Sequence, residues 1–175
     1  MAVSYPDKLL KPVADELLAC LCAAVLAAPV PTAQCGFRPY INGTPMFGTL
    51  EDECCGGLAF VYPGSGQPVV SGNTADPGPV NCSLIWGATM QIGIWRCAPI
   101  GTLQEPVDQV DWTSTQNQLF DDFATLRQAV CCFIAARKTK TVTVGEYTII
   151  NNGPEGACIG SSITLQVNLG RPLSV

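Results

Sequence analysis

The sequence predicts an α+β domain in which two helices pack on one face of a four-stranded, mainly antiparallel sheet. Two segments carry apolar residues at helical spacing, and four others alternate apolar residues with polar or small ones. Their order is α-β-β-α-β-β, and the turns between consecutive strands favour hairpins and therefore antiparallel pairing. A length of 175 residues, 47% of them hydrophobic, suits a single domain over 1–175 with one core.

The first helix is expected between Pro6 and Ala28, because apolar residues recur there at a spacing of three to four. Its second half, residues 17–28, also imitates the apolar region of a secretory signal. Asp15 and Glu16 lie directly against that run, where a signal prefers no acid, and the run is too short to span a bilayer. A buried helix is therefore the better interpretation.

Two segments rich in proline and glycine flank the first predicted strand, which covers residues 55–62. Residues 29–52 contain four prolines and three glycines, so an irregular conformation is expected there. Residues 63–81 contain four of each and are interpreted as a long surface loop, a kind of segment that is usually functional or disordered in compact domains. The loop residues proposed to contact a partner are Pro63, Gly64, Ser65, Gly66, Gln67 and Pro68.

The second predicted strand, residues 84–95, has the clearest alternation in the chain. One parity is apolar throughout and faces the core. Ile85 and Trp95 lie on the other parity, and we expect a partner to cover them there.

The second helix is expected to begin at Thr113, which forms a capping box with Gln116, and to continue to about Arg137. Its apolar stripe contains Leu119, Phe123, Leu126, Val130, and either Phe133 or Ile134. The chain then closes with a hairpin, whose strands alternate over residues 142–149 and 163–169 and whose turn is predicted at residues 151–156.

Composition argues against catalysis and against nucleic-acid binding. The chain has no histidine, which excludes histidine-activated nucleophiles and the usual histidine metal sites, so no enzymatic activity, cofactor or metal is expected. Its net charge of −5 has the wrong sign for neutralising phosphates. The only carboxylate clusters are Glu51, Asp52 and Glu53, and Asp121 with Asp122, and the latter two are expected to be solvated near the helix start.

The ten cysteines allow two interpretations. No C-x-x-C pair exists, so a zinc site is not favoured. In a chain that can bury a core, cysteines in predicted helices behave as small hydrophobic residues, and mostly free thiols are the preferred interpretation. One or two disulfides remain open among the loop residues Cys35, Cys54, Cys82 and Cys97, and synthesis in a reducing compartment follows from the preferred case.

Three segments together resemble a known family: the first helix (PDKLLKPVADELLACLCAAV), the second strand with its following helix (LIWGATMQIGIWRC, TQNQLFDDFATLRQAVCCFIAA), and the last strand (GPEGACIGSSITLQVNL). In arrangement they are similar to the tail terminator, or tail completion, proteins of long-tailed bacteriophages, particularly those of high-GC hosts. The likeness covers most of the chain and rests on the order of elements.

The resemblance implies a structural protein of the virion neck, synthesised in the cytoplasm of a host bacterium. Its members form a homohexameric ring on the last ring of the tail tube, end tube growth and contact a head-tail connector or stopper protein. Glu51, Asp52 and Glu53 are candidates for an acidic lumen through which DNA passes without binding. Two alternatives stay open: another neck or minor tail component, and a secreted, disulfide-bonded binding domain.

Overall fold

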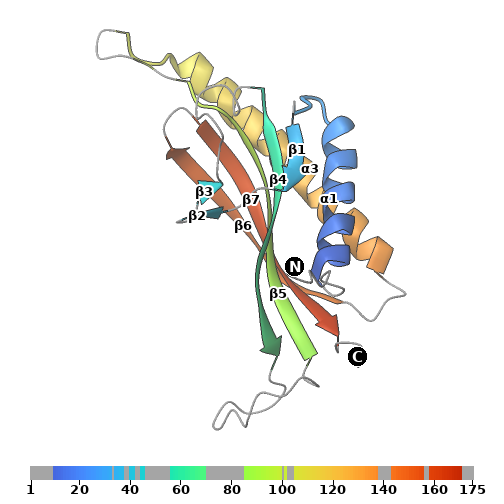
Figure 1. The fold of residues 1–175 in the computed structure, drawn as a ribbon. Coiled ribbons are helices and arrows are strands. Elements are labelled where there is room, and N and C mark those ends of the chain that lie inside the picture. The colour runs from blue at the N-terminus through green and yellow to red at the C-terminus, as the bar shows by residue number, and fades with distance from the viewer. Residues whose placement is uncertain are drawn as a thin grey trace, which may run out of the picture.

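The computed structural model confirms the α+β class and its two helices, and it corrects the sheet. The structure describes residues 10–32, 34–37, 40–41, 44–45, 56–69, 85–99, 101, 105–137, 143–155 and 158–170. The main sheet has five strands, is mixed, and follows the order β1-β4-β5-β7-β6 (Figure 1). In chain order the two helices and the main-sheet strands read α-β-β-β-α-β-β.

The elements have these bounds: α1 Leu10–Leu26, β1 Gln34–Phe37, β2 Tyr40–Ile41, β3 Thr44–Pro45, β4 Leu58–Val69, β5 Ile85–Cys97, α3 Gln109–Arg137, β6 Thr143–Glu155 and β7 Cys158–Gly170. The β2 and β3 strands pair only with each other, as a small separate ribbon.

The additional strand is β1, which lies inside the segment predicted to be irregular, residues 29–52. It pairs in parallel with β4, from Gln34 opposite Leu58 to Phe37 opposite Val61, so the predicted number of four strands is wrong. Only four residues long and with a glycine in the middle, β1 has too little alternation to be recognised from sequence. Its position is fixed by tertiary links, among them the disulfide from Cys22 on α1 to Cys35.

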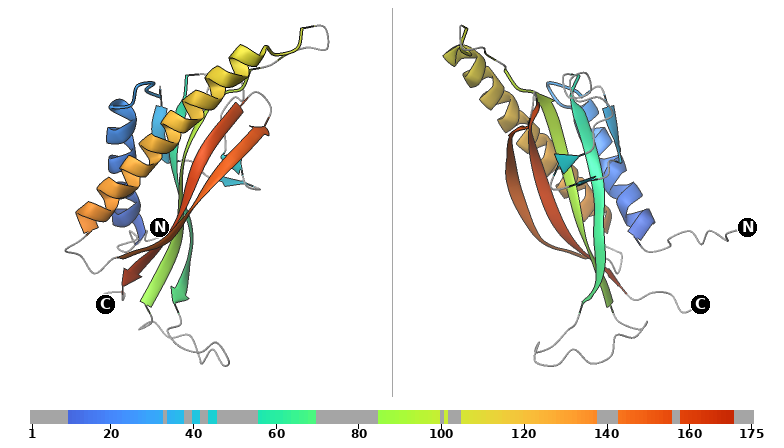
Figure 2. Two further views of the ribbon diagram at one scale, coloured as in Figure 1. Left: turned by 180° about the vertical axis from the view of Figure 1, so that it is seen from behind. Right: turned by 60° about the vertical axis from the view of Figure 1, so that its left-hand side comes forward.

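Both helices pack on one face of the sheet and share a single core with it, as predicted (Figure 2). The sheet residues in this core have one parity in each strand, for example Ile92 in β5 and Ile163 opposite it in β7. The helices contribute Leu17 and Leu21 from α1 and Phe133 from α3, all fully buried. The predicted amphipathic stripes therefore face the sheet.

The opposite face of the sheet carries a second, smaller cluster of Phe60, Trp95 and Cys158. Each of the two aromatic rings lies over a glycine on the neighbouring strand. Phe60 pairs with Gly93, and Trp95 pairs with Gly160. A Cβ atom placed on Gly93 would come within 2.5 Å of the Phe60 ring, so glycine is required there to leave room for the ring.

Replacing Gly93 with valine is expected to destabilise the protein by about 1–3 kcal/mol, because the Phe60 ring must move inside a filled cluster. Gly36→Val in β1 is the matched control, since a Cβ there meets nothing within 4 Å. Urea unfolding of both variants measures the difference. Equal stability of the two variants would show that the ring accommodates the added side chain without cost.

The α3 helix begins at Gln109, four residues before the predicted start, and the capping-box prediction is wrong. Asp108 precedes the first turn and accepts hydrogen bonds there: the Val110 amide donates to its carboxylate at 3.3 Å, and the Trp112 amide donates to its carbonyl at 3.2 Å. The Thr113 hydroxyl donates instead to the Gln109 carbonyl one turn earlier, inside the helix.

The two hairpins are also longer than the sequence indicates. The β4 strand continues to Val69, so Pro63–Val69 are not part of a loop, and a register shift between Pro63 and Gly66 accommodates them opposite β5. This end of the β4–β5 hairpin extends beyond the helices (Figure 1). Likewise β6 runs to Glu155, so the turn predicted at residues 151–156 is mostly strand.

Candidate assembly surfaces

The first turns of α3 project beyond the sheet (Figures 1 and 2). Residues 108–114 are all exposed, and none of residues 109–118 is buried. Val110 is 69% exposed and Trp112 41% exposed, which is unusual for large apolar side chains so close together. The exposed apolar side chains give this end of α3 the character of a surface that a partner covers.

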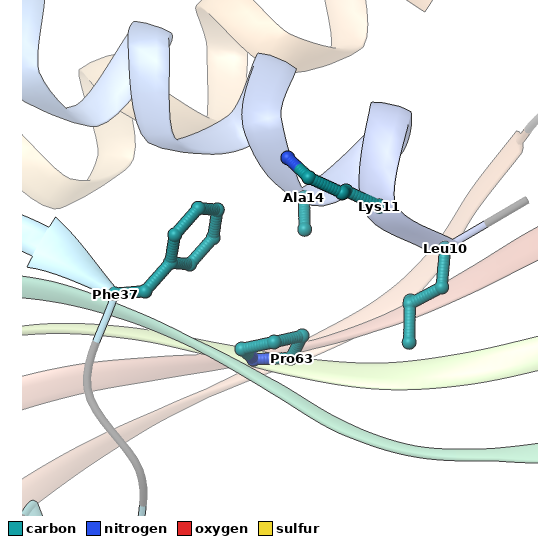
Figure 3. Close-up of a pocket in the computed structure, with 5 residues that line it drawn as sticks. All are labelled: Leu10, Lys11, Ala14, Phe37 and Pro63. Atoms are coloured by element: carbon teal, nitrogen blue, oxygen red, sulfur yellow. The ribbon is translucent and has the colours of Figure 1, made fainter. Parts of the chain in front are cut away.

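At the other end of the helix layer, a pocket of about 300 Å³ opens between the start of α1 and the sheet. Figure 3 shows Phe37 of β1 and Pro63 of β4 below α1, with the Leu10 side chain reaching down toward the strands. Ala14 completes the apolar lining, and Lys11 lies at the rim. Since the described lining residues other than Lys11 are apolar, the pocket suits an apolar side chain.

The outer strands of the sheet form a third surface. The β6 strand is the last in the order of the main sheet, is thirteen residues long, and exposes Ile149 and Ile150. Long edge strands with exposed apolar residues are sites at which chains associate. The other edge is β1, only four residues long.

A buried ion pair holds α3 against the sheet. Two guanidinium nitrogens of Arg96 in β5 donate to the two carboxylate oxygens of Asp122 in α3, at 2.7 and 2.6 Å. One of these nitrogens also donates to the Val30 carbonyl at 2.7 Å, which ties down the segment between α1 and β1. Burial raises the pKa of the Asp122 carboxyl from its ordinary 3.8, and the hydrogen bonds from Arg96 oppose that rise.

The prediction that Asp122 is solvated is therefore wrong, whereas Asp121 is exposed as expected. Asp122 lies on the same side of α3 as Leu126 and Phe133, so it belongs to the buried face. Arg96 is the only basic residue of β5. A lone basic residue in an apolar strand was the available signal that a carboxylate would meet it.

A second ion pair joins the helices at the other end of the layer. Arg137, the last residue of α3, pairs with Glu16 of α1, and its guanidinium lies 5.5 Å from the centre of the Phe133 ring. Polar links thus join the middle of α3 to β5 and the last residue of α3 to α1.

Among the residues that the structure describes, the cysteines are mostly paired, and this overturns the preference for free thiols. Cys20 of α1 is bonded to Cys132 of α3, and Cys22 of α1 to Cys35 of β1. Cys97 and Cys158 also form disulfides. Among the described cysteines only Cys131 is free, and it is exposed. Helical position is therefore no evidence for free thiols here, and the inference of a reducing site of synthesis loses its basis.

The residues predicted to contact a partner are distributed differently from the expected loop. Pro63 lines the pocket, Gly64 to Pro68 lie within β4, and Ile85 begins β5 opposite Val69. Trp95 is fully buried in the cluster with Phe60, so it is not available to a partner. Glu51, Asp52 and Glu53 lie outside the described residues. The projecting end of α3 was missed, because its predicted start excluded Val110 and Trp112.

Within the described part of the chain, no cluster of cysteine and carboxylate side chains is arranged to hold a metal ion. The described helices also include none with the length and apolar character needed to cross a membrane. No protein-family model matches the chain, and no curated protein matches it. The observations define a disulfide-linked α+β domain with exposed apolar surfaces.

Proposed function

We propose that this protein is a structural component of a long-tailed bacteriophage virion, a ring-forming tail terminator that caps the tail tube and joins it to the head connector. The observation that carries the proposal is the exposure of apolar side chains on ordered elements: Val110 and Trp112 on α3, and Ile149 and Ile150 on the edge strand β6. Such surfaces on a domain with a filled core favour assembly with further chains.

The charge of the chain is compatible with this role. Six copies at −5 each amount to about −30, and an acidic lumen repels the phosphates of DNA that passes through it. Glu51, Asp52 and Glu53 remain the candidates for that lumen. The protein's partners in this proposal are further copies of itself, the major tail tube protein, and a connector or stopper protein.

In this proposal the β4–β5 hairpin makes the partner contact that the sequence analysis assigned to a loop at residues 63–81. Its end extends past the helices, and Pro68 lies opposite Trp86 near the point where the strands separate. On its other side β5 pairs with β7 as far as Trp86, whereas among the described residues β4 is paired with β1 only over Leu58–Val61. The outer edge of β4 beyond Val61 can therefore present its backbone groups to a neighbouring chain. We assign it the contact with a tube subunit.

The disulfides favour a second candidate, a secreted binding domain. Disulfides persist in oxidising surroundings, which include both secreted proteins and virion surfaces. The two candidates differ in assembly, since a secreted binding domain has no need to form a closed ring of identical chains.

Electron microscopy of the purified, unreduced protein tests the proposal. We expect closed rings with a central hole, alone or after addition of tail tubes. A chain that stays monomeric in the presence of tubes, and that is recovered from the medium of expressing cells rather than from virions, would support the secreted domain instead.

A further inference from the structure

The projecting end of α3 and the pocket beside α1 lie at opposite ends of the same helix layer. The two helices are in contact and run in opposite directions, so the Gln109 end of α3 and the Leu10 end of α1 are far apart (Figures 1 and 2). A helix of 29 residues is about 40 Å long, which sets the scale of that separation. The two surfaces of one chain therefore cannot meet each other.

We propose that the projecting end of α3 in one copy binds in the pocket beside α1 of the next copy, with Trp112 as the anchor. The pocket is formed by Leu10, Lys11, Ala14, Phe37 and Pro63. This contact rests on the ring-forming function proposed above and names the surfaces that build the ring. Because the two surfaces differ, the contact is head-to-tail, the type that closes into rings when the rotation between copies permits.

Charge supports a second copy as the occupant. The projecting end carries Asp108 and Asp111, both exposed, and the sequence has no lysine or arginine between Arg96 and Arg127. The pocket carries Lys11 at its rim, with a side chain that is 63% exposed. Arg96 and Arg137 are buried in ion pairs, so among the described residues Lys11 and Arg127 are the exposed cations.

Lys11 is able to exchange its partner. It forms an ion pair with Asp15 one turn along α1, and both side chains are about half exposed or more. Exposed pairs of this type contribute little to stability, so an acid from a neighbouring chain can take the place of Asp15 at small cost. The acidic end of α3 meets that requirement, and like charges make two projecting ends poor partners for each other.

Size supports the same pairing. A pocket of about 300 Å³ with an apolar lining is at the lower end of the range for specific binding sites, and it suits one aromatic side chain. Trp112 offers a large apolar surface at low entropic cost, and tryptophan is enriched among the residues that dominate interfaces. Its position on exposed helical turns allows it to enter a cavity without rearrangement of the core.

The test measures self-association of the unreduced full chain by sedimentation velocity across a range of concentrations. Trp112→Ala is expected to raise the dissociation constant at least about 30-fold, as for an interface residue that dominates binding. Phe120→Ala, which removes a still more exposed aromatic further along α3, is the matched control and should leave association unchanged. Loss of association in Phe120→Ala but not in Trp112→Ala would overturn the contact.

Mixing two defective chains tests the head-to-tail geometry. Trp112→Ala keeps its pocket intact, while Phe37→Asp keeps the projecting end of α3 intact. Circular dichroism checks that both variants are folded. Lys11→Glu, which changes an exposed residue, serves as a second pocket variant. Each alone should be monomeric, and an equimolar mixture should form one-to-one dimers and nothing larger. A mixture that remains monomeric overturns the proposal.

The outcomes separate this contact from the ring itself. If the wild type forms rings and Trp112→Ala, Phe37→Asp and Lys11→Glu form them as well, the proposed function stands and the contact is refuted. Wild-type chains that join through this contact into open filaments would confirm the contact and refute the ring. A wild-type chain that remains monomeric throughout, tail tubes included, would refute both.

Discussion

Replacing Asp122 with alanine is expected to lower the free energy of unfolding by about 3–5 kcal/mol, the range typical of a buried ion pair that loses one partner. The Arg96 side chain is only 7% exposed, and without Asp122 it keeps the neutral Val30 carbonyl as a hydrogen-bond acceptor but loses its carboxylate. The guanidinium charge would then be left largely uncompensated in the interior. Urea unfolding followed by circular dichroism measures the loss.

The chain supplies its own control in the preceding residue. Asp121 is exposed, and Asp121→Ala should change stability by no more than about 0.5 kcal/mol, although it removes the same group from the same helix. The double variant Arg96→Met/Asp122→Leu removes both charges and should recover most of the lost stability. Equal losses in Asp121→Ala and Asp122→Ala would contradict the assignment of the ion pair.

The contrast between Asp121 and Asp122 shows which features of α3 the local sequence determines. Helical spacing correctly placed Leu126 and Phe133 on the buried face of α3, because that pattern depends only on apolar residues and helix geometry. It assigned Asp122 to solvent, since a carboxylate is normally exposed unless paired. The pairing depends on Arg96, 26 residues away on a strand, and no local pattern contains that contact.

The same reasoning explains the errors in the sheet. The β5 and β7 strands were recognised because long alternation reflects a buried and a less buried face. The β1 strand was missed because four residues carry no such signal, and its pairing with β4 is parallel and non-local. For β4, prolines and glycines over 63–69 indicated a loop, yet a register shift allows this stretch to pair with β5.

The candidate surfaces were likewise predicted only in part from the sequence. The sequence indicated assembly and placed one contact at Pro63, which the structure shows in the pocket lining. It did not indicate the projecting end of α3, because the capping-box pattern at Thr113 matched a helix start four residues too late. The sequence also did not predict the burial of Trp95, because its ring is accommodated by Gly160 on the neighbouring strand β7.

The disulfide between α1 and α3 gives the second large expected effect. Its cysteines are 112 residues apart in sequence, and cross-links across loops of this length are expected to stabilise by about 4–5 kcal/mol through the entropy of the unfolded chain. The double variant Cys20→Ala/Cys132→Ala should therefore unfold at markedly lower urea concentration than the wild type under non-reducing conditions. Under full reduction the difference between the two proteins should largely vanish.

Cys131 is the matched control, because it adjoins Cys132, is free and is exposed. Cys131→Ala should leave stability within about 0.5 kcal/mol of the wild type with or without reductant. Glu16 and Arg137 join the same two helices non-covalently, so the double variant should keep its fold while losing stability. A double variant as stable as the unreduced wild type would mean that Cys20 and Cys132 remain thiols in the mature protein, and it would contradict the assignment of this disulfide.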